Sequence, residues 1–321
     1  KKTIKAKSII TNLLFVNSKP PILVIPDIHS GEYTVLFKGE KIEDDKTVPV
    51  IRNHQKINDD SEAVFYFPGC GSERLFSQVG LATQAMLYEV GAITVLPPGY
   101  LCCGYPQTSS GNHDKGQEIT SDNRVQFHRV ANTLNYLDIK TVIVSCGTCM
   151  DQLQKYEFEK IFPGCRLLDI HEYLMEKGVR MEGISGQQYM YHDPCHSPMK
   201  TYDSLDVTKT LMNKDVTLND RCCGESGTFA ISRPDIATQV KMRKQEEIEK
   251  GVSEINVSNN SPVKILTSCP SCLQGLSRYG EETDTTSDYI VVELAKNNLG
   301  DQWLEEYIEK ATNGGIEKIL L

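Results

Sequence analysis

Several features that define common protein classes are missing from this 321-residue sequence. No apolar run approaches the roughly 18–20 residues that a membrane-spanning helix needs, since the run over 9–16 is short and interrupted by Thr11 and Asn12. The first residues lack the long apolar core and the small-residue cleavage site of a signal peptide. Positive charge is not in excess, because 34 Lys and Arg stand against 43 Asp and Glu, so we expect no nucleic-acid partner.

Nucleotide-binding and hydrolase motifs are missing as well. The sequence has no Gly-x-Gly-x-x-Gly and no Walker sequence, and the segment 224–227 (Gly-Glu-Ser-Gly) is one residue short of a nucleophile elbow. Hydride chemistry on a bound cofactor is therefore not expected within this chain. The composition, 39% hydrophobic and 24% charged, is typical of folded proteins and argues against global disorder.

Cysteine, in contrast, is abundant: eleven residues, with two adjacent pairs and two Cys-x-x-Cys pairs. A chain of this length folds on its own core and does not need a disulfide framework. The pattern indicates metal-binding thiolates in a reducing compartment, which predicts a cytoplasmic location. The sequence begins at Lys1 rather than at an initiator methionine, which leaves open whether it is a piece of a longer protein.

The cysteines form an internal repeat. A single cysteine, a Cys-Cys pair and a Cys-x-x-Cys pair occur twice in this order, and corresponding positions lie 120 to 125 residues apart. A five-element pattern at nearly constant offset signals duplication. The first copy comprises Cys70, Cys102, Cys103, Cys146 and Cys149, the second comprises Cys195, Cys222, Cys223, Cys269 and Cys272, and Cys165 is left over as an expected free thiol.

Strand and helix patterns alternate in both copies, which predicts parallel βαβ units and an α/β fold. Apolar residues at helical spacing predict helices over 75–90, 127–137, 171–177 and 236–249. The β-prone runs are Ala63–Phe67, 92–96, Thr141–Val144 and 166–170 in the first copy, and 188–191, Val216–Leu218 and 263–266 in the second. Each group of motif cysteines follows a strand. The five thiols of a copy should therefore converge at the carboxyl ends of one sheet.

Five thiolates per copy are more than a single metal ion requires. Thiolate is a soft ligand for zinc, copper(I) and iron–sulfur clusters, and a tetrahedral zinc or a cubane [4Fe–4S] cluster takes four protein ligands. Adjacent cysteines suit a larger metal cluster, on which each sulfur reaches a different iron or bridges two. From the residues alone two alternatives stay open: zinc-bound or free structural thiols, and two ordinary cubanes with one spare thiol each.

The repeated pattern Cys–x31–Cys-Cys-Gly–x41–Cys-x-x-Cys resembles the cysteine-rich CCG domain family. That family includes components of heterodisulfide reductase and of anaerobic glycerol-3-phosphate dehydrogenase, the iron–sulfur component of glycolate oxidase, and lactate-utilisation proteins. The resemblance covers about residues 62–294, and the stretch 67–149 is similar to the C-terminal part of large fusions of an FAD-linked oxidase with iron–sulfur domains. The second copy departs in spacing, with 26 residues between Cys195 and Cys222.

The resemblance implies two pseudo-symmetric CCG repeats, each a small parallel sheet flanked by helices, plus a short N-terminal appendage. We expect an extension or linker over 1–61, a first repeat over 62–185 and a second over 186–321. In the extension we expect strands over 22–25 and 33–37 around a turn at 27–32, and a loop at 43–46. By position, each set of five cysteines would hold one noncubane [4Fe–4S] cluster.

The expected function is electron transfer within a flavin-linked oxidoreductase of the lactate or glycolate dehydrogenase type. FAD would lie on a partner subunit or fused domain, and a ferredoxin-like iron–sulfur domain and a quinone or other acceptor would complete the electron path. One alternative is a component like that of heterodisulfide reductase, which cleaves a disulfide on a noncubane cluster; another is a zinc-bound scaffold without redox chemistry. Peripheral attachment at the inner membrane face is left open.

Two further pairs of residues flank the cysteines. His192 and His196 surround Cys195 and are candidate hydrogen-bond donors to cluster sulfur or proton donors to a substrate thiolate, with a structural role in a tight turn as the alternative. Gly104 and Gly224 follow the Cys-Cys pairs, where we expect them to let the backbone approach a cluster.

Overall fold

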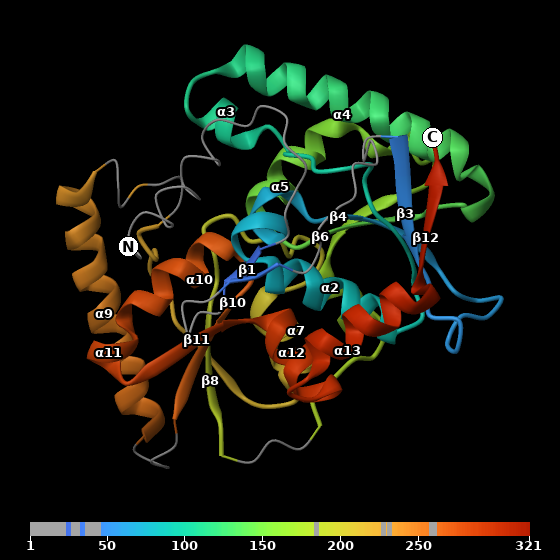
Figure 1. Ribbon diagram of the computed structural model, residues 1–321. Helices are drawn as coiled ribbons and strands as arrows, with labels where there is room; N and C mark the ends of the chain where they lie inside the picture. The colour runs from blue at the N-terminus through green and yellow to red at the C-terminus, as the bar shows by residue number, and fades with distance from the viewer. Residues whose placement is uncertain are drawn as a thin grey trace.

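The computed structural model describes residues 24–26, 33–35, 46–182, 186–225, 229, 233–256 and 262–321. Within these residues strands alternate with helices and form two largely parallel sheets, which confirms the predicted α/β class with two repeats (Figure 1). The chain builds the first sheet before the second, except for one strand that returns from its C-terminal end. The sheets therefore follow the duplication seen in the cysteines.

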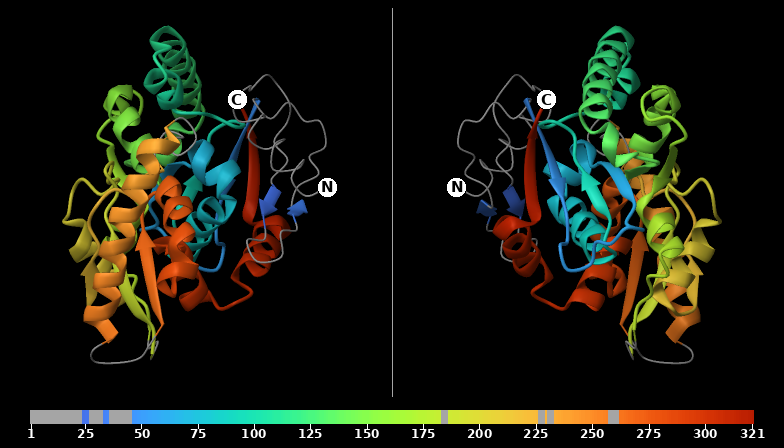
Figure 2. Two further views of the ribbon diagram at one scale, coloured as in Figure 1. Left: turned by 90° about the vertical axis from the view of Figure 1, so that its left-hand side faces the viewer. Right: turned by 90° about the vertical axis from the view of Figure 1, so that its right-hand side faces the viewer.

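The first sheet has the strand order β12-β3-β5-β4-β6-β7. Its parallel part consists of β4 (Ala63–Phe67), β5 (Ile93–Val95), β6 (Thr141–Val144) and β7 (Arg166–Asp169). At one edge β3 (Thr47–Ile51) pairs antiparallel with β5, and β12 (Ile316–Leu320) pairs antiparallel with β3. Figure 2 shows β12 in red beside β3 in blue, so segments from the two ends of the described core share this edge.

The second sheet has the order β11-β10-β8-β9 and is parallel throughout. Its strands are β8 (Gln188–His192), β9 (Val216–Leu218), β10 (Val263–Thr267) and β11 (Thr285–Tyr289). In each sheet the strand before the single cysteine, β4 or β8, lies next to the strand before the Cys-x-x-Cys pair, β6 or β10. The two sheets thus repeat one topology.

Alternating side chains assign the two faces of each sheet to different cores, because successive residues of a strand point in opposite directions. Val64 and Tyr66 of β4 belong to a core that also contains Tyr189 and Tyr191 of β8. Phe65 of β4 belongs to a second core on the outer face of its sheet. The outer face of the second sheet has its own smaller core. One shared core therefore joins the two repeats.

Helices fill the space between the sheets and cover their outer faces. The shared core contains residues of α2 (Ser77–Glu89), α6 (Ile170–Glu176), α7 (Ser204–Met212), α12 (Ile290–Leu299) and α13 (Trp303–Lys310). On the outside, α4 (His113–Thr133) covers the first sheet and α9 (Pro234–Asn256) the second. Shorter helical segments include η2 (Gly71–Leu75), α3 (Tyr105–Ser109), η3 (Asn135–Leu137), α5 (Gly147–Leu153), η4 (Gln154–Tyr156), η5 (Phe158–Lys160), α10 (Pro270–Leu276), η7 (Ser277–Tyr279), α11 (Gly280–Thr283) and η8 (Ala311–Gly315).

The N-terminal segment differs in part from the expected appendage. The strands expected near residues 22–25 and 33–37 correspond to an antiparallel pair, β1 (Val24–Pro26) and β2 (Tyr33–Val35). The turn at 27–32 and the loop at 43–45 lie outside the described residues. Strand β3 also falls in this segment, yet it belongs to the first sheet. The boundaries of the three expected units stay predictions.

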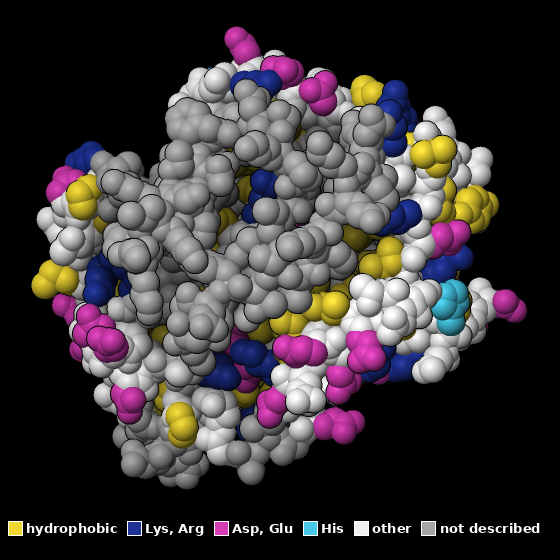
Figure 3. All heavy atoms as spheres, viewed as in Figure 1, with side chains coloured by type: hydrophobic (Ala, Val, Ile, Leu, Met, Phe, Trp, Pro, Cys, Tyr) yellow, Lys and Arg dark blue, Asp and Glu magenta, His cyan; other side chains and the backbone are white. Residues whose placement is uncertain are grey.

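The described surface offers no membrane-spanning helix and a mixture of charges. In the part of the chain that the structure describes, no helix is both long and apolar enough to cross a bilayer. Acidic and basic side chains intermingle on the face shown in Figure 3. Ion pairs at the surface include Lys241 Nζ with Glu282 Oε1 at 3.1 Å. Such exposed pairs contribute little to the free energy of folding.

Candidate metal centres

All ten motif cysteines lie in loops or helix starts that follow the carboxyl ends of strands, as predicted. Cys146 comes two residues after β6 and caps the N-terminus of α5, and Cys269 stands in the same relation to β10 and α10. Neighbouring parallel strands end at one edge of a sheet, so their loops meet there. The topology therefore gathers each set of five thiols at one edge of one sheet.

The five thiols of the first copy are in contact with one another. The Cys102 side chain lies within hydrogen-bonding reach of Cys103 and Cys70, and Cys149 lies within reach of Cys103 and Cys146. Gly69, at φ +64°, makes room for this packing, because a Cβ there would lie 2.6 Å from Cys149 Sγ. The chain of contacts includes every cysteine of the first motif.

Four of the five thiols of the second copy are in contact with one another, on a more open side of the molecule, and Cys195 acts on them only electrostatically. Cys223 Sγ and Cys272 Sγ are 3.2 Å apart, Cys269 is a neighbour of Cys272, and Cys222 is a neighbour of Cys223. Cys195 is close enough to Cys222 to raise its pKa electrostatically, after the larger effects of the Cys223 contact and burial. Cys195 and Cys222 are exposed, whereas every cysteine of the first motif is at least partly covered.

Thiols packed this closely cannot all carry charge. In the first copy the contact with Cys102 and burial raise the pKa of Cys70 well above its ordinary value. Contacts with Cys103 and Cys70 lower the pKa of Cys102, since they share a proton with its thiolate. In the second copy contacts with Cys222 and Cys272 lower the pKa of Cys223. Full deprotonation of either set needs a compensating positive charge, and a metal centre supplies one.

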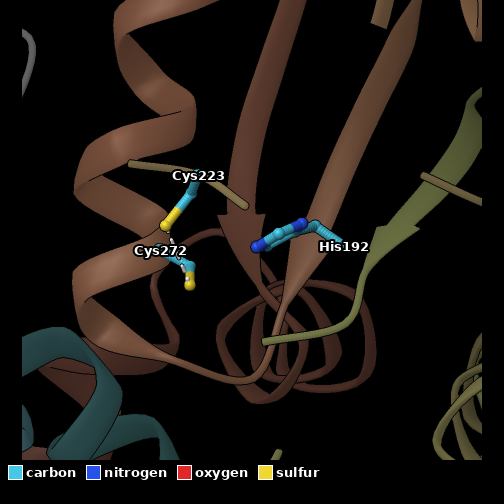
Figure 4. A group of neighbouring side chains, drawn as sticks. All are labelled: His192, Cys223 and Cys272. Carbon is cyan, nitrogen blue, oxygen red and sulfur yellow. Dashed lines mark hydrogen bonds between the residues drawn. The ribbon is translucent and has the colours of Figure 1, made fainter. Parts of the chain in front are cut away.

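His192 lies against the second set of thiols. It ends β8, its side chain is 1% exposed, and its ring points toward the sulfurs of Cys223 and Cys272 (Figure 4). One ring nitrogen and the two sulfurs lie within 4.8 Å of one another. On the other side Nδ1 is 3.0 Å from Lys244 Nζ, a buried group on α9. Burial lowers the pKa of Lys244 to about 8, and the thiolates of Cys223 and Cys272 oppose this effect.

His196 faces the first repeat rather than the interior of its own. Its Nδ1 contacts Asp151 Oδ2 on α5, and Lys200 Nζ lies 3.0 Å from the other oxygen of this carboxylate. The His196 side chain remains 39% exposed, so a ligand can reach it. Asp151 was not predicted, and its place two residues after Cys149 is the only sequence signal that could have suggested it.

The loops that carry the two sets of thiols pack against each other at the junction of the repeats. Gly147, next to Cys146, lies against the backbone of His196, next to Cys195. Gly71, next to Cys70, lies against Pro270, next to Cys269, and a Cβ on Gly71 would be 3.4 Å from Pro270 Cγ. The Cys-x-x-Cys loop of each copy therefore packs against the single-cysteine loop of the other.

A buried tyrosine joins the two Cys-x-x-Cys loops. The Tyr289 hydroxyl lies 2.6 Å from both Ser145 O and Ser268 O, the carbonyl oxygens directly before Cys146 and Cys269. Its side chain is 0% exposed, so these carbonyls have little access to water. Tyr289 was not predicted, because it lies at the end of a strand outside both motifs.

Replacing Tyr289 by phenylalanine should lower the free energy of unfolding by about 1–3 kcal/mol, since the two buried carbonyls lose the single hydroxyl proton that they share. A urea titration of the metal-free protein measures the change. Tyr136→Phe is the matched control, because the Tyr136 side chain is 63% exposed. The free energy of unfolding of this variant should lie within about 0.5 kcal/mol of that of the original protein. Equal midpoints for the two variants would show that the Tyr289 hydroxyl does not stabilise the junction.

Both glycines after the Cys-Cys pairs adopt left-handed backbone conformations. Gly104 has φ +86° and Gly224 has φ +77°, a region that other residues rarely adopt. Gly224 N donates a hydrogen bond to Cys222 Sγ at 3.3 Å. A Cβ on Gly104 would lie 3.0 Å from Gly116 O of α4, so this turn also packs closely on its outer helix. The proposed role beside a cluster stays a prediction.

The donor sets fit an iron–sulfur group better than a single ion. Tetrahedral zinc would use four of the five sulfurs and leave one thiol of the set unligated. A cluster offers several irons to sulfurs that approach from three different loops. Holding such groups would fall to the ten motif cysteines, whereas Cys165 comes just before β7, at the amino end of that strand, and burial raises its pKa to about 11.

Comparison with known proteins supports the same assignment. A sequence profile of the CCG cysteine-rich domain matches residues 64–154 and 189–277, and a profile of a domain of unknown function, DUF3400, matches residues 277–321. An uncharacterized iron–sulfur protein from Methanococcus maripaludis is 23% identical over 81% of this chain and 51% of its own length. A component of the CoM/CoB fumarate reductase from Methanothermobacter marburgensis is 27% identical over 64% of this chain and 40% of its own length.

A probable glycolate oxidase iron–sulfur subunit from Bacillus subtilis is 24% identical over 65% of this chain and 48% of its own length. The chain thus spans about half the length of the curated relatives it matches. The two matched CCG segments contain all ten motif cysteines and together cover more than half of the sequence. The chain therefore belongs to the CCG cysteine-rich domain family of iron–sulfur proteins.

Proposed function

We propose that this chain is the iron–sulfur electron-transfer component of a flavin-linked oxidoreductase of the lactate or glycolate dehydrogenase type. The supporting observation is the gathering of motif cysteines in each repeat, on loops that pack against each other at the junction of the repeats. Bound clusters would supply one-electron chemistry there. The similarity to a probable glycolate oxidase iron–sulfur subunit favours this substrate class.

The residues of the chain would do three things in this role. The first set of cysteines and the second would each hold one noncubane [4Fe–4S] cluster. The shared core would keep the two clusters at a fixed separation, since the loops that carry them pack directly on each other. The partly buried thiols of the first set would exclude water better than the exposed Cys195 and Cys222 of the second.

The remaining members of the electron path would lie outside this chain. FAD would belong to a partner subunit or fused domain, where a 2-hydroxy acid is oxidised. A ferredoxin-like iron–sulfur domain and a quinone or another acceptor would complete the path. The length of the relatives, about twice that of the matched region, leaves room for such domains.

A second function, disulfide cleavage at the second site, has its own supporting observation. Cys195 and Cys222 are exposed, and the neighbouring His196 is held by Asp151 and remains partly open to solvent. Cleavage of the disulfide to two thiols would take two electrons, delivered through bound clusters from the flavin partner, and two protons; His196 would give one of these protons to a departing thiolate, and Asp151 would orient its ring. The similarity to a component of the CoM/CoB fumarate reductase is compatible with this chemistry.

Iron and acid-labile sulfide per chain, measured on protein purified without oxygen, test the proposal together with EPR spectra. We expect about eight irons, and spectra of the oxidised and reduced forms that differ from those of cubanes. Near-zero iron with stoichiometric zinc after anaerobic reconstitution would contradict it and leave the zinc-bound scaffold. Reduction of a disulfide by the purified chain with an artificial electron donor would favour catalysis over electron transfer alone.

A further inference from the structure

Lys244 is a buried cation behind the second site. Its side chain is 0% exposed although lysine almost always reaches water. An ammonium group has three protons to donate, and Lys244 Nζ has three acceptors. They are His192 Nδ1 at 3.0 Å, Asn219 O at 3.0 Å and Asp220 O. The surroundings of Lys244 therefore offer one hydrogen-bond acceptor for each proton of a charged ammonium group.

Two groups face His192 Nδ1: Lys244 Nζ at 3.0 Å and the carbonyl oxygen Asn219 O at 3.4 Å. Because an ammonium group can only donate, the closer contact makes Nδ1 an acceptor and leaves Nε2 as the ring nitrogen that carries a proton. Nε2 is buried and has no hydrogen-bond partner among the described residues. Figure 4 shows the ring directed at Cys223 and Cys272. One ring nitrogen lies within 4.8 Å of both sulfurs, so an Nε2–H group on this side would be a hydrogen-bond donor to a thiolate ligand of a bound cluster.

The first site has no equivalent pair among the described residues. By the offset of the repeat, His192 corresponds to Phe67, three residues before the single cysteine in each copy. By the 120-residue offset of the Cys-Cys pairs, Lys244 corresponds to Arg124 of α4, which is partly exposed and pairs with Glu157, and the buried side chain beside it is Asn123. Asn123 is buried like Lys244 and bonds Cys102 O at 2.7 Å, but it is uncharged. The two sites therefore share their thiols and differ in their electrostatic surroundings.

We propose that Lys244 and His192 form a positioning pair that donates a charge-supported hydrogen bond to the sulfurs of the second site and makes it the higher-potential site of the two. The inference rests on the proposed function, because it presumes clusters at both sites. Reduction adds negative charge, and a nearby cation with a donor to sulfur stabilises the reduced state. Electrons would therefore run from the first site toward the second, where Cys195 and Cys222 are exposed to a partner or substrate.

Variants that copy the first site test this assignment. His192→Phe and Lys244→Asn are expected to move the midpoint potential of one EPR-detected cluster to lower values and to leave the other unchanged. His192→Gln keeps a donor and should restore part of the shift. Lys241→Asn is the matched control, since Lys241 lies on the same helix and pairs with Glu282 at the surface. Unchanged potentials in both variants, or equal shifts of both clusters, would overturn the proposal.

A second measurement does not need iron. Nitrogen NMR of the metal-free, reduced protein should show His192 protonated on Nε2, and Lys244→Asn should change this signal while Lys241→Asn should not. Protonation on Nδ1 would overturn the pair, since Nε2 would then be free to bind a metal itself. Should the chain fail to incorporate iron, the proposed function fails, and the NMR result still decides whether Lys244 sets the tautomer of His192.

Discussion

Replacing Cys149 by serine is expected to remove about four of eight irons per chain and to leave the second site loaded. Cys149 is 3% exposed and contacts both Cys103 and Cys146, so it stands at the centre of the first set. A serine hydroxyl is a much harder ligand than thiolate and binds iron–sulfur clusters poorly. Cys272→Ser should have the mirror effect, because Cys272 contacts Cys223 and Cys269 in the second set.

Iron and sulfide analysis of the two variants, with EPR, checks this expectation. Cys165→Ser is the control, since Cys165 lies outside both sets and should retain the full iron content. Complete iron in Cys149→Ser would show that four sulfurs suffice. Loss of all iron from either single variant would contradict two independent sites. The two variants also assign the EPR signals to the first and second sites.

Replacing Gly147 by valine should cost more than about 4 kcal/mol of stability, the range in which single substitutions become exceptional. Any Cβ at this position would overlap His196 O and lie 2.7 Å from His196 C. Both are backbone atoms, so the clash cannot be relieved by a change of rotamer. Either α5 or the loop after Cys195 must move, and cysteines of both sites lie on these two segments. Gly147→Val should therefore reduce iron at both sites.

The denaturant midpoint and the iron content of Gly147→Val test this expectation together. Gly71→Ala is the matched control: Gly71 also follows a motif cysteine, but its Cβ would meet Pro270 at 3.4 Å, an ordinary van der Waals contact. This control should stay within about 1 kcal/mol of the original protein. If Gly147→Val had the stability of the original protein, the contact between α5 and the loop after Cys195 would not be needed for stability, and the expectation would be wrong.

The sequence predicted the strands next to the cysteines well. The bounds of β4, β6 and β9 were predicted to the residue, because apolar β-prone runs end there in turn-forming residues before a cysteine. Strand β3 was not predicted: it contains Pro49, which argues against a strand, and it lies outside the repeats. Helices α12 and α13 and strands β11 and β12 were also missed, since the cysteine pattern says nothing about the region that follows it.

The site was predictable in its thiols and not in their surroundings. Convergence of five cysteines follows from topology, because parallel strands end at one edge. The burial of Lys244 does not follow from sequence, since Lys241 and Lys244 both occur in a charged stretch of α9 and only one of them is buried. Which of the two lysines is buried depends on how α9 packs on the second sheet. The joining of the two motifs by Tyr289 likewise depends on tertiary packing.

The pairing of β12 with β3 has a consequence for synthesis on the ribosome. These strands are more than 260 residues apart in the chain, yet their hydrogen bonds form one edge of the first sheet. During translation the first repeat therefore emerges with β3 unpaired on one side until residues 316–320 have been made. An unpaired edge can recruit strands of other chains. Closing so long a loop also slows folding, so the first repeat is expected to complete its fold only after translation of the second.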